Sequence, residues 1–240
     1  MQDKFNFINE IFRFVGTAKA TDKEIVFKDR VIILFKAFLL VFAFSFLINL
    51  LFRNNSHSIS ESLVCLNNNK LAIILLLLLT PLHEEVMFRL FLTKFHAKYF
   101  IVSFSFILSF FAKILAEDLL YHNNLLCGIL WDYSYYIIFA AFFYIILTAF
   151  KKSINKLEQT WNRYFVVFFY ISSILFMLIH FNAEFYANYG ILGIIKLLPI
   201  FMVGFFSGFI RINIGFSYSV FFHIIINTPS TFLIVLGNVL

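Results

Sequence analysis

Ionisable and amide side chains occur at three places in an otherwise apolar chain, and their spacing suits catalysis. The first place is "HEEVMFR", where Glu85 and Arg89 are four residues apart and share one helix face, with the carboxylate in the favourable N-terminal position. Such a charge-assisted pair neutralises both groups in a low dielectric. Glu84 points about 100° around the same helix. One carboxylate is therefore held in a pair and one is left for chemistry.

The other two places combine histidine with an aromatic or an amide side chain. "FMLIHF" puts Phe176 and His180 on one helix face, and "FFHIIINTPS" does the same for His223 and Asn227. Structural explanations stay open for all three places. The charges of the first could meet water at a helix end, His180 could be a packed core histidine, and the last pair could be a hydrogen bond between helices.

Taken together, these side chains are the components of water-driven amide hydrolysis. A glutamate such as Glu84, or a neutral histidine, can take a proton from water. A second histidine and Asn227 can donate hydrogen bonds to a developing oxyanion. No serine or cysteine has a base paired to it by local spacing, so a covalent nucleophile is the less attractive hypothesis.

The composition predicts where this chemistry takes place. Of 240 residues, 62% are hydrophobic and 13% are charged, whereas soluble domains have roughly 45–50% apolar and about 25% charged residues. We therefore expect an all-α, polytopic membrane helix bundle. The net charge of +6 is better explained by membrane topology than by binding to nucleic acid.

Segments that cross a bilayer need roughly 20 mostly apolar residues. The chain has seven runs of about this length, and an eighth could lie within 99–122 or 121–150. The seven predicted transmembrane helices are 31–52, 71–93, 99–116, 129–150, 164–184, 190–210 and 214–236. We therefore expect a transmembrane bundle over 31–240.

The segment 1–30 precedes this bundle and carries a different pattern. Phe5, Ile8, Phe12 and Val15 recur at helical spacing among polar residues. This pattern predicts an amphipathic helix that lies in the membrane interface on the cytoplasmic side. A soluble helix that binds a partner is the alternative interpretation.

Basic residues predict the orientation of the bundle. Thirteen Lys and Arg residues lie before the first predicted helix or in loops on the same side, against two in loops on the other side. The positive-inside rule therefore puts the N-terminus in the cytoplasm and the C-terminus outside the cell membrane. Glu84 then lies toward the cytoplasmic side and His180 late in an outward helix. The two come closer if that helix continues through "FNAEFYANY".

The three motifs also carry a family resemblance. They resemble, in order, the signatures of the CPBP family, the CAAX-protease and bacteriocin-processing (Abi) family of intramembrane endopeptidases. The resemblance covers about 70–230, which would be the protease-like core. The residues that carry it are Glu84-Glu85-x-x-x-Arg89, Phe176-x-x-x-His180 and His223-x-x-x-Asn227.

The resemblance implies a bundle of membrane helices and a glutamate-activated water. Glu84 would be the general base, and His180 its partner in activating water. His223 and Asn227 would form the oxyanion hole. The substrate would be a membrane-associated peptide or protein that is cut near the membrane surface.

The resemblance assigns supporting roles to the remaining motif residues. Glu85 and Arg89 would be a supporting ion pair, and Phe176 a packing residue. A Zn²⁺ held by the glutamate and the two histidines is conceivable, because two histidines and a glutamate are a known catalytic ligand set. The ligands are scattered and no HExxH is present, so we expect no metal and no other cofactor.

Two other functions fit a membrane bundle with these residues. One is a catalytically silent immunity or scaffold protein of the same fold. The other is a small transporter that uses Glu84 and the histidines as a proton relay, although the chain lacks the internal duplication that many transporters show. The lipid bilayer is the one partner common to all these hypotheses, and the sequence leaves the substrate and the oligomeric state open.

Overall fold

The computed structural model describes residues 6–20, 25–51, 70–115, 125–181, 190 and 192–237. Every regular element within these ranges is a helix, so the predicted all-α class is confirmed. The chain forms two compact units, and each is described by itself. The first comprises Met1–Asn55 and Trp161–Ile226, and the second comprises Ser56–Thr160 and Asn227–Leu240.

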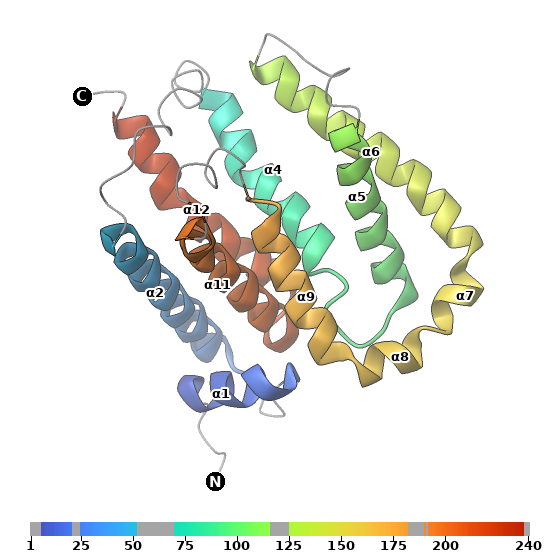
Figure 1. The fold of residues 1–240 in the computed structure, drawn as a ribbon, viewed down its shortest axis with the longest axis horizontal. Coiled ribbons are helices and arrows are strands. Elements are labelled where there is room, and N and C mark those ends of the chain that lie inside the picture. Colours follow the sequence, from blue (N-terminus) through green and yellow to red (C-terminus); the bar gives the residue numbers. More distant parts are fainter. Residues whose placement is uncertain are drawn as a thin grey trace. The chain divides into compact units, whose positions relative to one another are not determined.

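The first unit is built around α11, which packs against both α9 and α2. Its core is aromatic, because phenylalanines of α9 and α11 meet edge to face, as Phe169 and Phe205 do at 5.5 Å between ring centroids. Figure 1 shows α1 crossing the end of α2 in this unit. The helices of the unit are α1 (Phe7–Thr17), α2 (Phe27–Leu51), α9 (Phe165–Leu178), α11 (Leu192–Asn213) and the first part of α12 (Phe216–Gly237).

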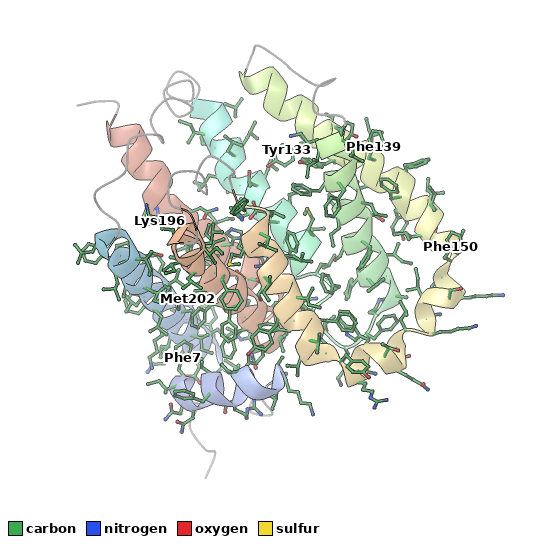
Figure 2. The ribbon with its side chains drawn as sticks, in the orientation of Figure 1. Phe7, Tyr133, Phe139, Phe150, Lys196 and Met202 are labelled. Carbon is green, nitrogen blue, oxygen red and sulfur yellow. The ribbon has the colours of Figure 1, made fainter. Side chains whose placement is uncertain are left out.

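The second unit is built around α5, which packs against α4 and α6. The buried Ser105 and Ser109 each donate a hydrogen bond to the carbonyl one turn earlier on α5. Thr80 of α4 and Tyr133 of α6, which is labelled in Figure 2, share a hydrogen bond of 2.8 Å. The long helices are α4 (Lys70–Phe88), α5 (Ala97–Leu115) and α6 (Leu125–Ala149), followed by the short α7 (Lys151–Asn155) and α8 (Glu158–Arg163).

Several of the described helices could cross a membrane by length and composition. Three do so alone, namely Phe27–Ile48, Ala97–Leu115 and Gly193–Asn213. A fourth span results if Tyr133–Ala149 and Lys151–Arg163, which are bent by 74° at their junction, are counted as one. The membrane character predicted from composition therefore stands, with three or four candidate spans among the described residues.

Two helices end earlier than the predicted spans, at points that matter for the site. α4 ends at Phe88, where the amides of Arg89 and Leu90 both donate to the Glu85 carbonyl, at 2.9 and 3.0 Å. α9 ends at Leu178, and the amide of His180 donates to the Met177 carbonyl at 3.2 Å in a tight turn. The predicted continuation of that helix falls on 182–189, outside the described residues.

Candidate functional site

The ion pair predicted from the first motif lies at the C-terminal end of α4. Glu85 and Arg89 are both 0% exposed, with Arg89 Nε 3.8 Å from Glu85 Oε1. The guanidinium also lies over the Phe88 ring, 5.6 Å from its centroid, where a cation is attracted to the π-face. The two charges are therefore buried, in contrast to the alternative in which they meet water at a helix end.

Glu84 precedes this pair and is itself buried. The turn of α4 that carries both glutamates is fixed from the side by α5, because Ser103 Oγ donates to the Val86 carbonyl at 2.8 Å. Met87, in the same turn, is also buried. The backbone that presents Glu84 is therefore held by packing and by a hydrogen bond between helices.

His83 is a further polar residue of this region, for which no role is predicted from the sequence. Its ring packs on Tyr136 of α6 at 4.3 Å between centroids, and it also contacts Tyr133 of α6 and Phe106 of α5. This is the packing expected of a core histidine. The only sign of this packing in the sequence is the position of His83. It immediately precedes Glu84, so its side chain leaves the helix in a different direction from that of Glu84.

The second and third motifs meet in the first unit. The Phe176 ring is buried, with its centroid 4.9 Å from the His180 ring and 5.4 Å from the His223 ring. These contacts join the end of α9 to α12. Two histidines that are distant in the sequence therefore contact one phenylalanine.

The hydrogen bond of His180 indicates which ring nitrogen carries its proton. His180 Nδ1 lies 2.8 Å from the Phe176 carbonyl oxygen. A carbonyl can only accept, so Nδ1 carries the proton and donates it. In the neutral ring Nε2 is then the acceptor.

His223 is buried on α12, and a hydrogen bond one turn away holds α12 to α11. One turn earlier, Ser219 Oγ donates to the Ser207 carbonyl of α11 at 2.9 Å. One turn later on α12 comes Asn227, which is half-buried. Helical spacing puts His223 and Asn227 on the same side of α12.

The structure thus places the motif residues in two groups. Glu84, Glu85 and Arg89 belong to the second unit, whereas Phe176, His180 and His223 belong to the first. Asn227, one turn after His223 on α12, falls in the second unit. Among the described residues, no group of three or more His, Cys, Asp or Glu side chains is arranged to hold a metal ion. Comparisons find no protein-family profile, curated protein or solved structure that matches this chain.

Proposed function

We propose that this chain is an intramembrane endopeptidase of the CPBP type, which hydrolyses a peptide bond near the membrane surface with an activated water. The main observation that supports the proposal is the contact of Phe176 with both His180 and His223. Local spacing alone cannot bring these two histidines to one phenylalanine, because His180 follows α9 whereas His223 lies on α12. A shared site for the two motifs is what a hydrolase of this kind requires.

In the proposed reaction Glu84 and His180 activate the water. Glu84 takes a proton as the water oxygen attacks the carbonyl carbon, and His180 Nε2 accepts a hydrogen bond from the same water. His223 and Asn227 donate to the oxyanion that forms. The C–N bond then breaks as the proton passes to the leaving nitrogen, giving a carboxylic acid and an amine.

The proposal also includes a membrane topology with more transmembrane helices than the three or four candidate spans. We infer seven transmembrane helices, or eight, in the cell membrane, with the N-terminus in the cytoplasm and the C-terminus outside. The supporting observation is that each of the seven predicted runs overlaps a described helix, namely α2, α4, α5, α6, α9, α11 and α12. The substrate in this topology is a membrane-associated peptide or protein.

The proposal is tested by replacing His223 with alanine. We expect His223→Ala to lower the rate of peptide cleavage by about 10²–10³-fold, the usual effect of removing one oxyanion-hole donor. The measurement compares the peptides released in membranes that carry equal amounts of wild-type and variant protein. His96→Ala, which changes an exposed histidine before α5, is the matched control and should cleave normally.

Two outcomes would count against this assignment. Unchanged cleavage in folded His223→Ala protein would remove His223 from the oxyanion hole. No difference in released peptides between membranes with and without the wild-type chain would favour a membrane protein without hydrolase activity. Thermal unfolding of each purified variant shows whether the truncation at this buried position has damaged the fold instead.

A zinc-dependent variant of the mechanism can be separated from the metal-free one. Glu84 and the two histidines suit Zn²⁺ as donors, and the Nδ1 bond of His180 to a carbonyl is one that metal-bound histidines also make. When bound, the ion would lower the pKa of the attacking water. We expect dialysis against a strong chelator to leave the cleavage rate unchanged, because Glu84 serves as the base. Loss of activity that added Zn²⁺ restores would overturn the metal-free mechanism.

A further inference from the structure

The N-terminal helix α1 has well-defined ends. The Asn6 side chain caps its start and accepts from the amides of Ile8 and Asn9, at 3.2 and 3.3 Å. Its end is closed by Ala18 in the left-handed conformation, with φ 45°, whose amide donates to the Phe14 carbonyl. These caps fix the helical register, so each side chain of α1 has a definite direction.

The inner strip of α1 packs on the first unit. Phe14 is 1% exposed, and its ring meets Phe169 of α9 at 5.0 Å and Phe209 of α11 at 4.9 Å, both edge to face. Phe7, labelled in Figure 2, is also buried and contacts Phe209. In addition, the Tyr170 hydroxyl of α9 donates to the Val15 carbonyl. α1 is thus fastened to α9 and α11.

A second apolar strip on α1 is left uncovered by the unit. Ile8 is 62% exposed, Phe12 is 75% exposed and Val15 is 45% exposed. Positions i, i+4 and i+7 share one side of a helix, so these side chains form a continuous outer strip. The apolar part of α1 is therefore wider than the face that packs against protein.

The remaining side of α1 is polar and completes a three-sided helix. Asn9 and Arg13 are exposed on it, and Arg13 forms a 2.8 Å ion pair with Glu10. A helix with separate protein-facing, apolar and polar strips fits the edge of a bundle at a membrane surface, where protein, hydrocarbon and water meet. The chain continues into α2, a candidate span that begins at Phe27.

We propose that α1 is a lipid-bound brace, whose outer strip of Ile8, Phe12 and Val15 inserts into the acyl-chain boundary of one leaflet while its inner strip holds α9 and α11. Exposed basic residues next to the strip, Arg13 and Lys19, suit anionic lipid headgroups. A second copy of the chain is a poorer occupant, since three side chains fall well short of the roughly 1,200 Å² that a stable interface buries. The inference is independent of the proposed proteolysis.

Spin labels on the full chain in vesicles test the lipid contact. Phe12→Cys and Asn9→Cys, each in a Cys65→Ser/Cys127→Ser background, place a nitroxide on the outer strip and on the polar strip. In vesicles of mixed zwitterionic and anionic phospholipid, we expect the label at 12 to collide with oxygen and to be shielded from a water-soluble nickel chelate. The label at 9 should show the reverse.

Either of two results at position 12 would overturn the lipid assignment. Strong collision with the nickel chelate would mean that the strip faces water. Weak collision with both reagents, together with spin–spin broadening that dilution with unlabelled protein removes, would mean that a second copy covers the strip.

Hydrogen exchange tests the brace itself. We expect Phe12→Asp to speed amide exchange in the first turns of α9 by about tenfold in vesicles. The reason is that α1 loses the apolar side chain that inserts into the bilayer and therefore holds α9 less firmly. Asn9→Asp, on the polar strip, is the matched control and should exchange like wild type. Peptides from α5 report whether the variant has unfolded as a whole. Unchanged exchange in α9 in folded Phe12→Asp protein would refute the brace.

Discussion

Glu84→Gln will lower the rate of peptide hydrolysis by about 10²–10⁴-fold, the usual contribution of a general base. Glutamine keeps the size of the side chain and removes its basicity. The protein should still accumulate in the membrane, because the substitution keeps both partners of the buried Glu85–Arg89 ion pair. Comparative peptidomics of membranes with wild-type or variant protein measures the loss and identifies the substrate.

A matched substitution controls for the loss of a negative charge. Glu158→Gln changes an exposed glutamate of α8 and should leave both yield and cleavage unchanged. Full activity in Glu84→Gln would end the proposal of a glutamate base. The same result would leave the lipid-bound brace intact, because the readouts for α1 do not involve cleavage.

The positions of the helices could be predicted from local sequence properties, but the C-terminal ends of α4 and α9 could not. Long apolar runs predicted seven transmembrane helices. Each run overlaps a described helix, and three or four candidate spans are found among the described residues. The ends of α4 and α9 coincide instead with particular hydrogen bonds. The backbone carbonyl of Glu85 accepts hydrogen bonds from two amides where α4 ends. In the turn after α9, His180 Nδ1 donates a hydrogen bond to the Phe176 carbonyl. A hydropathy pattern carries no information on such bonds.

The candidate site was predictable to the extent that helical spacing defines it. Residues four apart share a face, which anticipates the contact between Phe176 and His180. The contact of Phe176 with His223 is tertiary, and the motif resemblance could indicate such an association without giving its geometry. The packing of His83 on Tyr136 could not be predicted from the sequence, in which only the position of His83 beside Glu84 is visible.

The N-terminal helix shows the same limit of sequence patterns. Spacing predicted an amphipathic helix with Ile8, Phe12 and Val15 on its apolar side. The structure divides the apolar residues of α1 between two strips, because Phe7 and Phe14 face protein whereas Ile8, Phe12 and Val15 stay exposed. Periodicity measures the width of an apolar face, but only packing shows how much of that face the protein covers.

Replacing Glu85 should damage the fold as well as the activity. Glu85→Ala removes the carboxylate that forms an ion pair with Arg89, and the Arg89 side chain is 0% exposed. Removing one partner of a buried ion pair costs about 3–5 kcal/mol, a large share of the 5–15 kcal/mol by which proteins are typically stable. We therefore expect low yield in the membrane and a lower unfolding temperature in detergent, measured beside wild type.

A double variant distinguishes two effects of Glu85→Ala, namely the buried charge left on Arg89 and the loss of the Glu85 carboxylate itself. Glu85→Ala/Arg89→Leu removes both charges, and replacing a buried pair by apolar side chains is often neutral or stabilising, so we expect yield and unfolding temperature to recover toward wild type. Glu84→Ala, one residue away, should keep near-normal yield while losing cleavage. Normal yield in Glu85→Ala would contradict the structural role of the pair. If the double variant folds and cleaves, the pair supports the helix end that carries Glu84 and takes no part in the chemistry.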